Sequence, residues 1–228
     1  MNKYLVVVAG GKGLRVGGAI PKQFLPIGGE PILMHTLRAM NGALAPKRIV
    51  VVLPESHMEH WRRICEGHHF DVPHEMVIGG DTRWQSVKNG LATLPDDGLV
   101  AIHDGVRPFV AVKVVQGCAE AAKEHGGAIP TLPLNDSLRQ LDGDNSFIVH
   151  RSSYLAVQTP QIFRTAELKH AYERPYSEEY TDDAAVYEAD GGVVSLIRGN
   201  RENIKITHSS DLLFANALLS SPMREKYS

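Results

Sequence analysis

This sequence of 228 residues has only two cysteines, no excess of basic residues and no long apolar run. Its two cysteines, Cys65 and Cys118, lie 53 positions apart, so neither a disulfide framework nor a cysteine-based metal site is expected. A formal net charge of −2 argues against a generic nucleic-acid binder, which usually carries a strong basic excess. No apolar run approaches the roughly 18 residues of a membrane span, and the N-terminal run is too short for a signal peptide. These absences predict a cytoplasmic protein with neither nucleic acid nor membrane as a partner.

Short apolar runs alternate with amphipathic stretches along the whole chain. The runs are rich in Val and Ile and end at Gly, Pro or Asp, which is typical of strands buried in a parallel sheet. This alternation favours an α/β fold with a mostly parallel twisted sheet flanked by helices, in a single domain over residues 1–228. Strands are expected at Tyr4–Val8, Arg48–Leu53, Glu75–Ile78, Leu99–Ile102, Ala128–Leu132 and Val193–Ile197. Helices are expected at Pro31–Met40, Ser56–Glu66, Thr82–Leu94, Val112–Glu124, Ala166–Tyr172, Thr181–Ala189 and Ser210–Leu219.

One stretch, Pro133–Gln161, leaves no room for a further strand–helix–strand unit. It has a turn-rich centre, Leu141-Asp-Gly-Asp-Asn145, between short β-type runs at Ser137–Gln140 and Phe147–His150. We therefore expect a protruding β-hairpin arm at about residues 133–158. An isolated two-stranded hairpin is marginally stable in water, so the arm predicts a partner surface and hence a homodimer.

A glycine-rich loop, Gly10–Gly29, follows the first strand and contains Lys12, Arg15 and Lys22. It is not the dinucleotide-binding loop, because Val16 stands where the last glycine of that pattern would be. The Walker pattern of P-loop enzymes is also absent. Glycines let backbone N–H groups approach a phosphate chain, and fixed cations beside them suit a triphosphate. The loop therefore predicts a triphosphate site of another class.

Several further motifs occur in a fixed order and carry a family resemblance. The loop pattern Ala9-Gly-Gly-x-Gly-x-Arg15 with Pro21-Lys-Gln23 is similar to the signature of the sugar-phosphate nucleotidyltransferases. It is most similar to the cytidylyltransferases that act on polyol phosphates such as methylerythritol phosphate. The resemblance implies a Rossmann-like nucleotidyltransferase fold and covers nearly the whole chain. The supporting motifs are Gly79-Gly-Asp-Thr-Arg83-x-x-Ser86, His103-Asp-Gly-Val-Arg107-Pro108, Asp136-Ser137, Arg151, Thr159-Pro-Gln161, Thr181-Asp-Asp-Ala184 and Asn203-Ile-Lys205-Ile-Thr207.

The implied reaction is attack of a sugar-phosphate oxygen on the α-phosphorus of CTP, with pyrophosphate as the leaving group. A phosphate monoester is already mostly dianionic at pH 7, so the nucleophile needs no general base. The chemistry calls instead for cations, backbone donors and a divalent metal. The resemblance implies that Arg15 and Lys22 stabilise the transition state at the α-phosphate. It gives Arg151 and Lys205 the task of holding the incoming sugar phosphate.

The remaining site residues follow from the same motifs. The end of the apolar strand Leu99–Ile102 places Asp104 at the sheet edge where α/β proteins bind ligands, which suits Mg²⁺. The polyol phosphate is expected to contact Asp104, Arg107, Ser137, Arg151, Thr159, Thr181 and Lys205. The nucleotide is expected to contact Ala9, Gly10, Gly11, Gly13, Gly80, Asp81, Arg83 and Ser86, although the sequence alone does not separate CTP from UTP.

Other interpretations of individual residues stay open at this point. Ribitol 5-phosphate is the alternative polyol substrate. A glycosyltransferase would use an Asp-x-Asp motif, but Asp142-x-Asp144 falls in the turn of the arm. A nucleotide-binding protein without catalytic activity would not need cations for both the nucleotide and the sugar phosphate. The pair Asp182-Asp183 is interpreted as the acidic first turn of a helix, and His57 and His60 are expected to be exposed.

Overall fold

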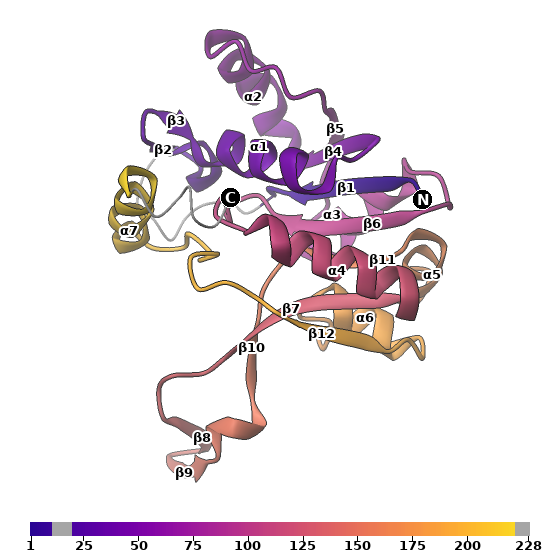
Figure 1. The fold of residues 1–228 in the computed structure, drawn as a ribbon, viewed down its shortest axis with the longest axis vertical. Helices are drawn as coiled ribbons and strands as arrows, with labels where there is room; N and C mark the ends of the chain where they lie inside the picture. Colours follow the sequence, from indigo (N-terminus) through magenta and orange to yellow (C-terminus); the bar gives the residue numbers. More distant parts are fainter. Residues whose placement is uncertain (11–19, 222–228) are drawn as a thin grey trace.

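The computed structural model describes residues 1–10 and 20–221, and the sheet at its centre is mixed (Figure 1). Its strands are β1 (Lys3–Val8), β4 (Arg48–Leu53), β5 (Glu75–Ile78), β6 (Leu99–Asp104), β7 (Gly127–Pro133), β10 (Leu155–Val157), β11 (Gln161–Arg164) and β12 (Val194–Arg198). Their order is β10-β7-β11-β6-β1-β4-β5, with β12 also paired to β7. Strands β6, β1, β4 and β5 run parallel, so their carboxyl ends meet at one edge of the sheet.

Helices cover both faces of this sheet. One face packs against α1 (Ile32–Leu44), α2 (Glu55–Gly67) and α4 (Val112–His125). The other packs against α3 (Arg83–Ala92), α5 (Thr165–Ala171) and α6 (Asp183–Ala189). Successive residues of β1 alternate between the two cores, because strand side chains point to opposite faces: Leu5 and Val7 join the first, Tyr4 and Val6 the second. The continuous apolar runs are thus explained by burial on both sides.

The predicted fold class is confirmed, and the expected strands and helices form with ends shifted by a few residues. Two strands of the central sheet were missed, as were the two-residue strands β2 (Pro26–Ile27) and β3 (Glu30–Pro31) at the end of the expected glycine-rich loop. Strand β11 lies antiparallel between β6 and β7, and β10 lies antiparallel at the edge of β7. The apolar part of β11 is only Ile162-Phe163, too short to give a strand pattern in the sequence. Its place in the sheet is decided by two neighbours that lie far away in the chain.

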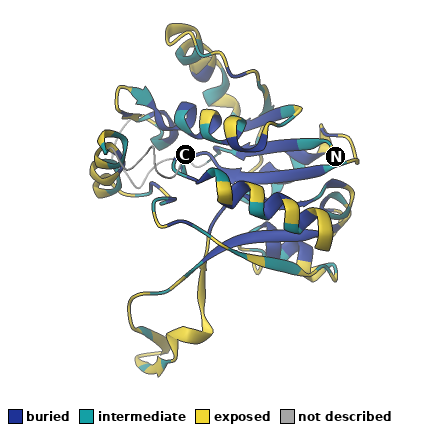
Figure 2. Cartoon of the chain, in the orientation of Figure 1, coloured by how far each residue is buried: buried dark blue, intermediate teal, exposed yellow. Residues whose placement is uncertain are grey.

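The hairpin forms where the turn signal places it. Strands β8 (Leu138–Asp142) and β9 (Asn145–Val149) pair antiparallel, and Gly143 has a positive φ of 56° in the turn. They form a separate sheet that projects away from the rest of the molecule (Figure 1). Most of the arm is exposed (Figure 2), including Leu141 and Ile148, each with 79% of its surface accessible. Two such highly exposed aliphatic side chains on one short hairpin indicate a surface that another protein could cover.

The carboxyl-terminal helix packs beside the segment that contains Lys22. This segment comprises the 3₁₀ turn η2 (Lys22–Phe24), β2 (Pro26–Ile27) and β3 (Glu30–Pro31). Helix α7 (Ser209–Ser220) encloses a small core with it, formed by Ile27, Ile32, Val106, Ile206 and Ala215. Within residues 1–10 and 20–221, no helix combines the length and apolarity needed to cross a bilayer.

Candidate active site

A cleft of about 1230 Å³ opens at the carboxyl ends of β1, β4, β5 and β6. This is the edge where open α/β sheets bind ligands. Its walls come from the β1 end, the Lys22 turn, the β4–α2 and β5–α3 connections, the end of β6 and the segment before α7. The lining contains most of the motif residues found in the sequence: Ala9, Gly10, Lys22, Gly80, Asp81, Arg83, Ser86, Asp104 and Lys205.

Backbone groups and one buried hydroxyl form the recess between β1 and β5. The Ser86 hydroxyl accepts a hydrogen bond from Gly80 N (3.1 Å) and donates to the Thr82 carbonyl (2.9 Å). A Cβ on Gly79 would lie only 2.9 Å from the Ser86 oxygen, so this close approach requires glycine. Backbone and Ser86 therefore line the recess, and these are among the groups that the motifs predict for the nucleotide.

Asp104 stands among cations from three different segments. Its Oδ2 lies 3.1 Å from Lys205 Nζ and 3.1 Å from Arg107 Nε, and its Oδ1 lies 4.0 Å from Arg83 Nε. Burial alone would raise the pKa of the Asp104 carboxyl, but the charges of these three groups outweigh it and hold that pKa well below its usual range. Asp104 is therefore ionised and orients Lys205 at the cleft. Arg107, a predicted substrate contact, also donates to the Asn203 carbonyl (2.8 Å) and is not among the residues that line the cleft.

Arg83 points inward to a partner that the sequence did not reveal. Its two guanidinium nitrogens donate to the two carboxylate oxygens of Asp183, which is fully buried, and Tyr172 donates to the same carboxylate. The interpretation of Asp182-Asp183 as the acidic start of a helix is confirmed, because Asp182 caps α6 by accepting from Ala185 N and Asp183 stands in its first turn. What the sequence did not reveal is that Asp183 also pairs with Arg83. Arg83 lines the cleft but directs its bidentate face to Asp183. Its place beside Asp104 is thereby fixed.

Thr159 is also engaged inside the protein. Its hydroxyl accepts from Asp104 N (3.0 Å) and contacts His103 Nδ1 (2.9 Å). His103 Nε2 lies 3.0 Å from the Arg107 carbonyl, which can only accept, so that nitrogen carries the proton and Thr159 donates to Nδ1. The expectation that the Thr159 hydroxyl contacts substrate does not fit this geometry. The hydroxyl instead braces the turn that presents Asp104 and Arg107.

His103 should make the free energy of unfolding depend on pH. Burial lowers the pKa of His103 from 6.5 to about 4, so the folded state keeps it neutral where the unfolded state is protonated. Because the unfolded state then binds more protons between about pH 6.5 and 4, stability falls as the pH drops through that window. The loss from this group should approach about 3 kcal/mol at the acid end.

Denaturant titrations at several pH values would measure this effect. The His103→Asn variant, which cannot take up the proton, should show a shallower decline than the unaltered protein over the same window. Equal slopes for the two proteins would contradict the buried neutral histidine.

The other histidine expectation is half right. His60 is exposed, but His57 is half-buried and lines the cleft, with its ring edge against Phe24. Burial, with a smaller effect of His60, lowers the pKa of His57. The helical spacing of the two histidines gave no sign that the start of α2 forms a wall of the cleft.

Some predicted site residues lie elsewhere. Arg151 and Ser137 are on the arm, and Arg151 is exposed and donates to the Asn135 carbonyl. Thr181 is exposed just before α6. None of these three lines the cleft of its own chain. Arg15, Gly11 and Gly13 fall outside the residues that the structure describes.

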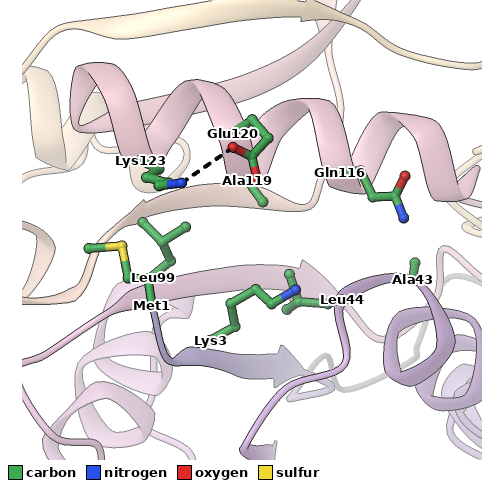
Figure 3. A pocket seen from close by; sticks show the side chains of 9 residues that line it. All are labelled: Met1, Lys3, Ala43, Leu44, Leu99, Gln116, Ala119, Glu120 and Lys123. Carbon is green, nitrogen blue, oxygen red and sulfur yellow. Dashed lines mark ion pairs between the residues drawn. The ribbon is translucent and has the colours of Figure 1, made fainter.

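A second pocket, of about 230 Å³, lies between α1, α4 and the amino ends of β1 and β6 (Figure 3). Its side chains include Leu44, Leu99 and the ion pair of Lys123 with Glu120, 3.7 Å apart. It contains no motif residue. The cleft at the opposite edge is therefore the candidate active site.

Comparison with known proteins identifies the family. The family profile of 2-C-methyl-D-erythritol 4-phosphate cytidylyltransferase matches residues 4–221. The chain belongs to this family. A cytidylyltransferase of this name from Phocaeicola vulgatus is 48% identical over 219 residues, covering 96% of this chain and all of the relative. The one from Bacteroides thetaiotaomicron is 49% identical with the same coverage.

Solved structures of the family share the fold. The 4-diphosphocytidyl-2C-methyl-D-erythritol synthase of Anaerococcus prevotii superposes with a TM-score of 0.82 at 28% identity, covering 96% of each chain. The cytidylyltransferase of Thermus thermophilus gives 0.77 at 32% identity, covering 97% of this chain and 100% of that one. The resemblance seen in the sequence motifs is thus confirmed, and the chain is a nucleotidyltransferase.

Proposed function

We propose that this protein joins CTP and 2-C-methyl-D-erythritol 4-phosphate to give 4-diphosphocytidyl-2-C-methyl-D-erythritol and pyrophosphate, in the non-mevalonate route to isoprenoid precursors. The observation that supports this most is the cleft itself. Its lining combines a recess of backbone and Ser86 with Lys22, Lys205 and Asp104, and Arg107 pairs with Asp104 behind it. Two anionic substrates can therefore meet beside one set of fixed cations. The alternative substrate, ribitol 5-phosphate, is not favoured by the relatives.

The chemistry assigned to these residues is electrostatic. The sugar phosphate is its own nucleophile, and His103 is buried, neutral and bonded at both nitrogens, so it takes no proton from substrate. Lys22 places a compact charge at the α-phosphate, where negative charge grows as the new P–O bond forms. Lys205 holds the attacking phosphate, and Asp104 sets its position. Arg15 remains a predicted partner of Lys22.

A magnesium ion is part of the proposal, but Asp104 does not fit as its ligand. The carboxylate already faces three cations within 4.0 Å, and a divalent ion placed there would be repelled by them. Among residues 1–10 and 20–221 there is no group of three or more acidic, histidine or cysteine side chains that could hold a metal. Magnesium usually takes its ligands from phosphates and water as well as from protein. We therefore assign it to the triphosphate and assign Asp104 to the polyol phosphate, with Arg107.

The arm accounts for the residues that the cleft lacks. Arg151 and Ser137 lie on it, and its exposed aliphatic side chains provide an apolar surface for a second copy. We propose a homodimer in which the arm of one protomer delivers Arg151 and Ser137 to the cleft of its partner. Thr181 as a substrate contact and a cytoplasmic location both stay predictions.

The substrate is tested by measuring pyrophosphate release with CTP and Mg²⁺. Methylerythritol phosphate should be turned over at least about 100-fold faster than ribitol 5-phosphate, because the site was inferred to position one polyol for attack. UTP in place of CTP tests the base, and a chelator tests the metal. Equal or faster turnover of ribitol 5-phosphate would refute the assignment of the substrate while leaving cytidylyl transfer intact. No nucleotide-dependent release with either polyol would refute the reaction.

A further inference from the structure

Gln23 is a buried polar side chain between two parts of the active site. Only 1% of its surface is accessible, yet it neighbours Lys22 in the η2 turn. Its side-chain Nε2 donates to the Ala9 carbonyl over 2.8 Å. A second, longer contact of 3.4 Å joins Nε2 to His57 Nδ1. One amide group thus connects the Lys22 turn, the end of β1 and the start of α2.

Ala9 is held from both sides in this arrangement. Its own N–H donates to the Val52 carbonyl of β4 (2.9 Å), which fixes it to the sheet. Its carbonyl would face the cleft wall without a side-chain donor if Gln23 were absent. The hydrogen bond of Gln23 therefore ties the turn to a rigid reference point at the very place where the nucleotide loop begins.

The turn has a separate anchor in the core. Phe24 is buried and stacks on Trp61 at a centroid distance of 5.7 Å and an interplanar angle of 11°. This packing holds the turn against α2, and the bond from Ile32 N to the Leu25 carbonyl (3.0 Å) ties the following residue to α1. Neither of these contacts reaches the end of β1, whereas the hydrogen bond from Gln23 joins the turn directly to Ala9.

We propose that Gln23 is a positioning residue: through its hydrogen bond to the Ala9 carbonyl it sets the place of Lys22 relative to the nucleotide, and it acts on the rate through Lys22. The inference rests on the proposed function. Displacing a catalytic group by about 1 Å can lower a rate about 100-fold, so the effect falls on kcat. Substrate binding, which uses many other contacts, changes little.

A double-mutant cycle separates positioning from general support of the fold. Gln23→Met keeps the length of the side chain and removes the donor. In the unaltered protein it should lower kcat at least about tenfold, with KM for both substrates within about twofold. On a Lys22→Ala background it should change kcat by less than about twofold, because the group it positions is already absent.

Gln116→Met serves as the matched control, since Gln116 is exposed on α4 beside the second pocket, and should leave kcat unchanged (Figure 3). Thermal unfolding of each variant shows whether Gln23→Met is equally destabilising on both backgrounds. A full, additive loss of kcat on the Lys22→Ala background would overturn the proposal, as would an unchanged kcat in the single variant. An inactive unaltered protein would instead count against the proposed function.

Gln23→Glu provides a second measurement, which also serves if the methionine variant folds poorly. An ionised carboxylate cannot donate to the Ala9 carbonyl, but a protonated one can. The ratio of kcat in Gln23→Glu to kcat in the unaltered protein should therefore rise as the pH is lowered. A ratio that stays flat with pH would overturn the role of the hydrogen bond.

Discussion

Replacing Lys22 with alanine should lower kcat about 100- to 1000-fold, the usual effect of losing one preorganised group that stabilises transition-state charge. Lys22 lines the cleft together with the end of β1, and the proposed mechanism assigns it to the α-phosphate of CTP. Charge at phosphorus grows only as the new bond forms, so the contact strengthens in the transition state. The KM for methylerythritol phosphate should stay within about threefold, because that substrate is bound by other groups.

Steady-state pyrophosphate release with each substrate varied in turn measures both constants. Lys123→Ala is the matched control: this lysine pairs with Glu120 in the second pocket, which contains no motif residue, and its loss should leave kcat unchanged (Figure 3). An unchanged kcat in Lys22→Ala would remove Lys22 from the transition state. A raised KM at constant kcat would make it a binding residue only.

The fold could be predicted because its signals are local. Apolar runs of β1, β4 and β6 are continuous, and a strand buried on both faces requires that pattern wherever its neighbours lie. The turn of the arm likewise depends on adjacent residues, with Gly143 supplying the positive φ. Strand β11 escaped prediction because its four residues gain their hydrogen bonds from β6 and β7, which are distant in the chain.

The site was predicted less completely, for a related reason. Motifs marked which residues gather at the cleft, but the direction of each side chain depends on partners that the sequence does not place. Arg83 and Asp183 are 100 positions apart, and Thr159 and His103 are 56 apart. Arg83 and Thr159 were both expected to contact a ligand, but these partners hold their side chains inside the protein. Gln23 is the reverse of this. The sequence suggested no role for this uncharged motif residue, and its hydrogen bond to the Ala9 carbonyl is visible only in the structure.

Two variants that are each inactive should regain activity when combined in one dimer. Arg151→Ala removes a cation that lies on the arm, whereas Lys22→Ala removes one from the cleft. If the arm serves the partner, a mixed dimer has one site with Lys22 from one chain and Arg151 from the other. The second site of that dimer lacks both. Random mixing should therefore restore about a quarter of the full activity per subunit.

If Arg151 served its own chain, every site in every mixed dimer would lack one of the two cations, and no activity would return. Differently tagged chains, refolded together and purified through both tags, would give a sample made only of mixed dimers. Its activity should then approach about half of that of the unaltered enzyme, since one site in two is intact. Mixtures of the two separately purified variants, assayed before their subunits can exchange between dimers, provide the baseline. Failure of the tagged chains to copurify would refute the dimer itself, and copurification without activity would place Arg151 outside the partner's site.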